Sequence, residues 1–169
     1  PIVELGDPRL RKEAMVVGRV FENAVINIIS DMKVTLASTD GVGLAAPQIG
    51  ESYQIIIIGS RPTDRYPLAP QMDSIVMINP SFTATNEHCE KDWEGCLSIP
   101  GIRALVPRYT EIQVDYQDIN GLRLHVHLSG FIARVFQHEF DHLMGHVYLD
   151  RVESNLDIVS EKMFQELYV

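Results

Sequence analysis

The chain has 169 residues, 46% of them hydrophobic, and a net charge of -9 at pH 7. A chain of this length can bury roughly two thirds of the surface that it exposes when unfolded, so we expect one domain over residues 1–169. The acidic balance argues against a broad nucleic-acid footprint, and the longest apolar run, residues 55–58, is far too short to cross a membrane.

The cysteines and the N-terminus favour a cytosolic protein. Cys89 and Cys96 form no C-x-x-C pair, and the first residues lack the pattern of a secretory signal peptide. We therefore expect no disulfide, and we interpret Cys89 as an ordinary thiol.

The first strong periodicity in the chain is helical. Apolar residues recur three and four positions apart between residues 21 and 36, which predicts an amphipathic helix packed on another element. These residues are Phe21, Val25, Ile28, Ile29, Met32 and Leu36.

A glycine-rich segment follows at residues 41–48, with the sequence GVGLAAPQ. It satisfies the dinucleotide-binding pattern G-x-G-x-x-A, but it follows polar residues and leads to Pro47 instead of opening a helix. The segment has no Lys-Ser or Lys-Thr pair for a P-loop either. Taken alone, it is a turn between a helix and a strand.

Several short segments are typical of strands. Residues 53–59 and 75–79 are rich in Ile and Val and bounded by Gly or Pro, and residues 61–73, with three prolines, are expected to form an exposed loop. Residues 111–116 and 122–128 flank Asn120 and Gly121, the pair that a tight antiparallel hairpin turn favours because both residues tolerate positive φ.

Two further helices are expected in the last third of the chain. Ser129 can cap a helix that ends near Gly145, and Ser154 with Asp157 resembles the start of a short last helix. The fold class is therefore α+β. Antiparallel or mixed sheets would pack around the helix that begins at Ser129, with an N-terminal helix and a short C-terminal helix beside them.

Residues 138–142, with the sequence HEFDH, are a candidate metal site. Residues four apart share one face of a helix, so His138 and His142 can bind one metal ion while Glu139 lies beside it. Two histidines are one ligand short of the three protein ligands that a catalytic metal typically takes.

Three candidates for the third ligand differ in spacing. Glu161 follows His142 at a thermolysin-like distance, but little chain remains after it to build the second lobe of such a protease. The longer metzincin pattern fails because Tyr148 stands where its third histidine should be. Cys96 offers a thiolate that suits a borderline divalent metal, although a lone cysteine is more often a buried structural thiol.

Three separated segments together resemble the signature motifs of the peptide deformylase family, in the same order. They are residues 41–48 (GVGLAAPQ), 94–98 (EGCLS) and 138–142 (HEFDH), and residues 7–11 (DPRLR) are also similar to the opening of that family. The resemblance spans nearly the whole chain. It implies a metal-dependent hydrolase that removes the N-formyl group from the N-terminal methionine of newly synthesised polypeptides and releases formate.

The resemblance also implies roles for individual residues. Cys96, His138 and His142 would hold one divalent metal, natively Fe(II), although this ligand set also suits Zn(II), Co(II) or Ni(II). Glu139 would be the general base, and Gln48 and the backbone N–H of Leu97 would stabilise charge on the formyl oxygen.

A pocket for the methionine side chain should be apolar, and Val42, Phe131 and Val135 are candidates for its wall. Gly43 would let the substrate backbone approach closely. By resemblance, Arg103 is a candidate contact to the substrate backbone. Arg134 is an unexpected neighbour for such a pocket and would lay its stem along the wall or turn away.

Other polar residues are assigned to the surroundings of the site. Glu94 and Asp141 are candidate structural acids, with Arg108 as a partner for Asp141. We expect His125 and His127 to be solvated strand residues.

The implied partners are N-formylmethionyl nascent peptides and, at the exit tunnel, the ribosome surface; we expect a monomer that binds neither membrane nor specific nucleic acid. The implied compartment is the bacterial cytoplasm, with an organelle as the alternative. Two other functional classes stay open. An endopeptidase with the same motif would need a cleft on both sides of the cut bond, and a structural metal module would have four protein ligands and no water.

Overall fold

The computed structural model of the protein describes residues 1–64 and 66–169. Its helices are α1 (Asn23–Ala37), α2 (Gly130–Leu143) and α3 (Glu161–Tyr168). Its strands are β1 (Gly43–Ala45), β2 (Ile55–Ser60), β3 (Met72–Ala84), β4 (Cys89–Cys96), β5 (Ile99–Tyr109), β6 (Glu111–Gln117), β7 (Arg123–Ser129) and β8 (Ile158–Ser160). Short 3-10 helices are η1 (Pro8–Arg11), η2 (Ala46–Ile49), η3 (Tyr148–Arg151) and η4 (Asn155–Asp157).

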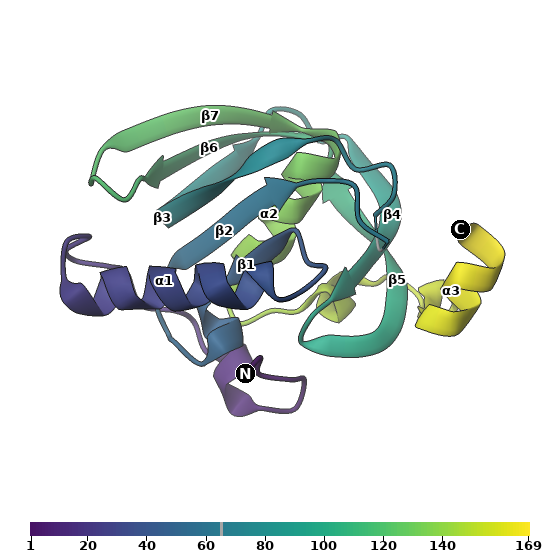
Figure 1. The fold of residues 1–169 in the computed structure, drawn as a ribbon. Coiled ribbons are helices and arrows are strands. Elements are labelled where there is room, and N and C mark those ends of the chain that lie inside the picture. Colours follow the sequence, from purple (N-terminus) through teal and green to yellow (C-terminus); the bar gives the residue numbers. More distant parts are fainter. Residues whose placement is uncertain (65) are drawn as a thin grey trace.

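The strands form two sheets around α2 (Figure 1). One sheet has five strands in the order β1-β2-β3-β6-β7, and the other has three in the order β4-β5-β8. Every pairing between these named strands is antiparallel. The expected α+β fold, with sheets packed around a central helix, is confirmed.

Side chains along β2 alternate between two hydrophobic clusters, one on each face of the five-stranded sheet. Ile55 and Ile57 pack with the apolar face of α1, whereas Ile56 and Ile58 pack with α2 on the opposite face of the sheet. All four isoleucines are at most 1% exposed. The central strand therefore fixes the position of α2 relative to the five-stranded sheet.

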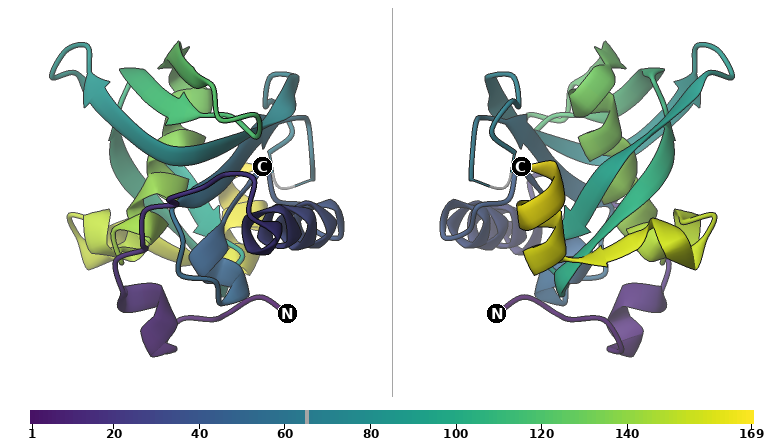
Figure 2. Two further views of the ribbon diagram at one scale, coloured as in Figure 1. Left: turned by 90° about the vertical axis from the view of Figure 1, so that its left-hand side faces the viewer. Right: turned by 90° about the vertical axis from the view of Figure 1, so that its right-hand side faces the viewer.

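The other side of α2 faces the smaller sheet. A third cluster joins β4 and β5 to the segment after α2, and it includes Cys96, Val106, Val147 and Tyr148. Figure 2 shows α3 (yellow) beside the β4–β5 ribbon and η1 (purple) beneath the sheets. The two sheets thus hold α2 from opposite sides.

Most predicted elements are present, with two local corrections. β6 and β7 form the expected antiparallel hairpin, but residues 118–122 make a longer loop in which the Asp118 carboxylate accepts from the backbone N–H groups of Asn120 and Leu122. Gly121 has φ 79°, whereas Asn79 is the only non-glycine residue with positive φ in the described part of the chain. Asn120 is therefore not part of a two-residue turn.

The second correction concerns the last helix. Ser154 caps η4, and α3 begins later, with Ser160 accepting from the N–H of Met163. Phe21, expected on the buried face of the first helix, precedes α1 and is 67% exposed. Across the described residues, none of the helices combines the length and apolar character needed to cross a membrane.

Candidate active site

Helix α2 carries the two histidines of the site on one face. The ligand atoms of His138, His142 and Cys96 all lie within 4.8 Å of one another, and all three residues are buried. Cys96 Sγ is 3.4 Å from His142 Nε2. Residues 46 positions apart in the sequence are thus brought into one cluster.

Strand β4 brings Cys96 to this helix. A short turn between Cys96 and Ile99 pairs the end of β4 with the start of β5, and the register shifts between Glu94 and Cys96. Both Glu94 and Cys96 are at most 3% exposed and lie next to α2. The three-stranded sheet therefore supplies the sulfur and a carboxylate, while α2 supplies the imidazoles.

Glu94 fixes the orientation of the first histidine. Its Oε1 accepts a hydrogen bond from His138 Nδ1 at 2.8 Å, which leaves Nε2 as the ligand atom of that ring. The ring of Tyr148 stacks on His138 with 5.8 Å between centroids. Glu94 was expected to be a structural acid near the site, and its direct bond to His138 is consistent with that interpretation.

A buried ionic network surrounds Glu94. Arg108 donates to both Glu94 oxygens, at 2.9 and 3.0 Å, and also to Asp141 at 2.6 Å. The predicted pairing of Asp141 with Arg108 is confirmed, and Arg151 also donates to Asp141 at 2.8 Å. Burial opposes ionisation of Glu94, but Arg108 and the hydrogen bond from His138 outweigh it and hold the Glu94 pKa well below its usual value.

The charges of the cluster favour a thiolate. Burial raises the pKa of the Cys96 thiol, but His142 and His138 outweigh that effect and lower it well below its usual value. Burial raises the pKa of Glu139 to about 7, with Cys96 and Glu94 adding to the effect and the two histidines opposing it. A carboxyl group with this pKa can accept and return a proton near neutral pH.

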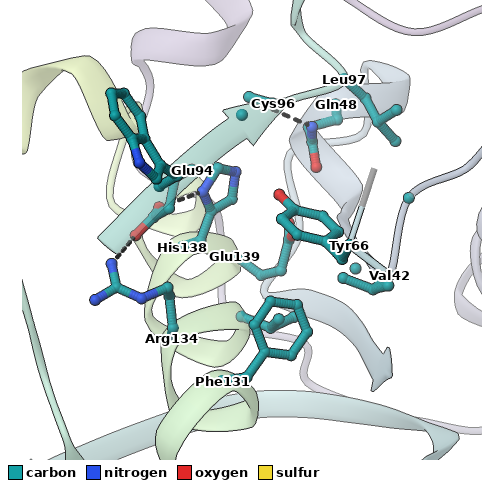
Figure 3. Close-up of a pocket in the computed structure, with 15 residues that line it drawn as sticks. Val42, Gln48, Tyr66, Glu94, Cys96, Leu97, Phe131, Arg134, His138 and Glu139 are labelled. Carbon is teal, nitrogen blue, oxygen red and sulfur yellow. Dashed lines mark hydrogen bonds and ion pairs between the residues drawn. The ribbon is translucent and has the colours of Figure 1, made fainter. Parts of the chain in front are cut away.

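Gln48 is held with its amide nitrogen toward the cluster (Figure 3). Its Oε1 accepts from the Ala45 N–H at 2.9 Å, and its Nε2 lies 3.2 Å from Ser98 Oγ and 3.6 Å from Cys96 Sγ. Because the carbonyl end is fixed by the backbone, the N–H₂ end remains beside the thiol.

One cavity connects the predicted site residues. Its wall includes Gln48, Cys96, Leu97, His138 and Glu139, together with four predicted substrate-binding residues: Val42, Gly43, Phe131 and Val135. His142 lies behind this wall at 1% exposure.

Arg103 lies apart from the other predicted substrate-binding residues and is not among those that line the cavity. It is fully buried, donates to Glu161 of α3 at 2.7 Å, and packs over the rings of Tyr66 and Phe164. Glu161, weighed above as a metal ligand, therefore pairs with this arginine and does not belong to the metal-binding cluster.

Two aromatic residues that line the cavity were not predicted from the sequence. Tyr66, from the loop between β2 and β3, packs against Phe131 with 5.1 Å between ring centroids, and Trp93 precedes Glu94 on β4. The lone aromatic side chain in a proline-rich loop, and the only tryptophan beside the second motif, were the available signals.

The cluster fits a divalent metal on its own geometry. Three buried ligand atoms converge, one of them on a thiol whose pKa is lowered. Glu139 Oε2 and His142 Nδ1 are buried without a hydrogen-bond partner among the described residues. Three protein ligands beside an open cavity are the arrangement of a catalytic metal site, whereas a structural site closes with four.

These features are those of a metal-dependent hydrolase: a helix with the H-E-x-x-H motif, a buried cysteine beside its two histidines, and an adjoining cavity. The sequence matches the polypeptide deformylase family over residues 1–157. The chain belongs to this family, as its three motifs indicated.

The relatives cover nearly the whole chain. "Peptide deformylase 2" of Nostoc sp. is 47% identical over 99% of this chain and 93% of its own, and "Peptide deformylase 1" of Bordetella pertussis is 45% identical over 89% and 86%. A class I type b peptide deformylase from Acinetobacter baumannii, solved with Met-Ala-Ser bound, superposes with a TM-score of 0.87 at 36% identity, covering 90% of this chain and 97% of that one. The enzyme of Synechococcus elongatus in complex with actinonin gives 0.81 at 38% identity, covering 93% and 80%.

Proposed function

We propose that this protein hydrolyses the formamide on the N-terminal methionine of newly synthesised polypeptides and releases formate. The proposal rests on one observation: the ligand atoms of Cys96, His138 and His142 lie within 4.8 Å of one another, beside a cavity that Glu139 and Gln48 also line. The related enzyme from A. baumannii holds Met-Ala-Ser, a peptide that begins with methionine, as a deformylated product would.

Cys96, His138 and His142 would hold the metal, and we infer Fe(II) as the native ion. A thiolate with two imidazoles suits borderline divalent metals, so Zn(II), Ni(II) or Co(II) can take the same place in a purified sample. A bound divalent metal supplies Lewis acidity that lowers the pKa of water and polarises a carbonyl.

The residues around the metal would handle the proton and the developing charge. Glu139 takes the proton of the attacking water on its buried carboxylate and delivers it to the departing amine, which must leave protonated. The Gln48 Nε2 group and the Leu97 N–H stabilise the charge that gathers on the formyl oxygen. Glu94 keeps His138 in one orientation throughout.

The methionine side chain would enter the apolar part of the cavity, formed by Val42, Phe131 and Val135, while Gly43 gives room to the peptide backbone. Arg103 does not line this cavity but packs on Tyr66, which does, with its guanidinium carbon 5.2 Å from the ring centroid. The earlier expectation that Arg103 bonds the substrate backbone would require it to exchange its bond with Glu161.

In the cell, the partners would be nascent chains that carry formylmethionine, met near the exit tunnel of the ribosome. We propose a monomer that acts as a single catalytic domain over residues 1–169 in a bacterial cytoplasm. The similarity to enzymes of Nostoc sp. and B. pertussis supports a bacterial setting.

Formate release from formyl-Met-Ala tests the function. The protein, purified without oxygen and loaded in turn with Fe(II), Ni(II) and Zn(II), should release formate from this peptide but not acetate from acetyl-Met-Ala. An endopeptidase would instead cut internal bonds of longer peptides. Absence of formate with every metal would refute the proposal.

Metal removal separates a catalytic from a structural metal. Chelation should abolish formate release while the far-ultraviolet circular dichroism stays native, because three hydrophobic clusters hold the fold without the metal. Unfolding on chelation would instead indicate a structural metal module.

A further inference from the structure

Arg134 is a buried cation in the cavity wall, beside the apolar residues that would receive the methionine side chain. It lies one helical turn before His138 on α2, so Arg134, His138 and His142 follow one another along the same helix face. The residue is only 7% exposed, and it lines the cavity together with Phe131 and Val135. A charge at this position requires bonds to several acceptors.

The guanidinium has those acceptors. Its Nη1 donates to Glu94 Oε2 at 2.8 Å and to the carbonyl of Val106 at 2.6 Å, and its Nη2 donates to the carbonyl of Glu90 at 2.7 Å. Figure 3 shows the side chain rising from α2 to Glu94. Arg134 thereby connects α2 to both β4, which ends at Cys96, and β5, which follows it.

Glu94 receives a full set of donors. Oε1 accepts from His138 Nδ1 and Arg108 Nη2, while Oε2 accepts from Arg134 Nη1 and Arg108 Nε. Without Arg134, Glu94 Oε2 would keep only its bond from Arg108, and the carboxylate would be held less firmly in the orientation that accepts from His138. Orientation of a metal-bound imidazole depends on this kind of partner.

We propose that Arg134 is a positioning residue: through Glu94 it fixes the Nδ1–H donor of His138, and its stem forms part of the wall of the methionine cavity. One side chain thus links the substrate pocket to a metal ligand. The inference rests on the proposed function for its kinetic consequence, but the geometry that it describes can be tested without turnover.

The test compares Arg134→Met with the parent chain in the Zn(II)-loaded form. Methionine keeps an apolar stem but removes every donor. In the parent, nuclear magnetic resonance should detect a downfield Nδ1–H signal of His138 that exchanges slowly with solvent, and in Arg134→Met this signal should broaden or vanish. Zn(II) affinity, measured by chelator competition, should fall roughly tenfold, the lower end of the range for partners of metal ligands.

Arg151→Met is the matched control because Arg151 belongs to the same network but contacts Asp141, not Glu94 or the cavity. It should keep the His138 signal and the Zn(II) affinity. Arg134→Lys keeps the charge but cannot reach all three acceptors, so it should lie between the parent and Arg134→Met. If Arg134→Met does not fold, Arg134→Lys is judged by the same measurements.

Kinetics separate this inference from the proposed function. With an active parent, Arg134→Met should lower kcat for formyl-Met-Ala about tenfold, the lower end of the same range, and Arg151→Met should leave it unchanged. An Arg134→Met protein that retains the His138 signal, Zn(II) affinity and kcat within twofold of the parent overturns the role of Arg134. An inactive parent refutes the proposed function instead. The His138 signal and the Zn(II) affinity then decide whether Arg134 positions His138.

Discussion

At the scale of single residues, Glu139 is the group on which the proposed chemistry most depends. The residue is 5% exposed, and its Oε2 has no hydrogen-bond partner among the residues that the structure describes. Glu139→Gln should therefore bind metal as the parent does but lose about 10²- to 10⁴-fold in formate release. Metal content by atomic emission and initial rates of formate release would check this. Retained turnover would remove Glu139 from the role of base.

Gly43 provides a way to disturb the same carboxylate without changing it. A Cβ at this position would lie 2.6 Å from Glu139 Oε1, so Gly43→Ala must push the carboxyl aside. A displacement of about 1 Å can cost ~10²-fold in rate, and we expect a loss of this order in kcat with unchanged metal content. Gly18→Ala is the control because nothing lies within 4 Å of its added Cβ. Equal kcat values for the two variants would contradict this reasoning.

Of the residues in the site, the sequence predicts only those that lie close together in the chain. His138 and His142 are linked by helical spacing, whereas the place of Cys96 came from resemblance to a family and not from spacing. The partner of His138 lies 44 residues earlier in the chain, and no periodicity relates Glu94 to it. The burial of Arg103 and its bond to Glu161 were not predicted, because Glu161 comes from a helix whose position against β5 depends on tertiary packing.

At the scale of elements, the end of α2 depends on Gly145. This residue has φ 76°, and an added Cβ would lie 2.7 Å from the carbonyl oxygen of Arg11. Gly145→Ala should lower the free energy of unfolding by about 2 kcal/mol or more, since left-handed strain and a backbone clash combine. Urea unfolding would measure it. Gly101→Ala has a similar φ of 80° with nothing within 4 Å, so it should show the strain alone. If both variants lose the same free energy of unfolding, the close approach of the added Cβ to the Arg11 carbonyl oxygen does not destabilise the protein.

Elements with one clear periodicity were predicted well, and those whose pattern depends on distant partners were not. The helix at residues 23–37 followed from its apolar spacing, and the hairpin of β6 and β7 followed from the Asn120-Gly121 pair between two short strand-like segments. β4 is mostly polar and exposed over residues 89–92, so its sequence resembles a loop, and pairing with β5 makes it a strand. β8 has three residues and exists only because it pairs with Ile102, Arg103 and Ala104.

At the scale of the whole molecule, the N-terminal segment is fastened to the region after α2. Ala14 donates its N–H to the carbonyl of Leu143, and Arg11 of η1 pairs with Asp150 of η3. Asp150 also accepts from the Val147 N–H at 2.8 Å. These bonds join segments more than 100 residues apart next to the C-terminal end of the metal-binding helix, so the N-terminal segment supports this end of the helix from outside.

This ion pair predicts how stability changes with acid. Burial opposes ionisation of Asp150, but the hydrogen bonds from Arg11 and the Val147 N–H outweigh it and lower the pKa below the ordinary aspartate value. A lowered pKa in the folded state means that the stabilisation is complete above the unfolded-state pKa and is lost as pH falls through the folded-state pKa. From about pH 6 to about pH 3, the parent should therefore lose more unfolding free energy than Asp150→Asn, by at most about 1 kcal/mol because the pair is partly exposed.

Urea unfolding at several pH values would measure this difference, with Arg11→Met and the double variant completing the cycle. Asparagine can still accept from the Val147 N–H, so Asp150→Asn removes mainly the charge. If the pair is responsible, Arg11→Met flattens the acid dependence in the same way, and the double variant adds little to either change. Parallel pH profiles for the parent and Asp150→Asn would show that this attachment of the N-terminal segment does not depend on charge, and that backbone bonds such as the one from Ala14 to Leu143 hold the segment instead.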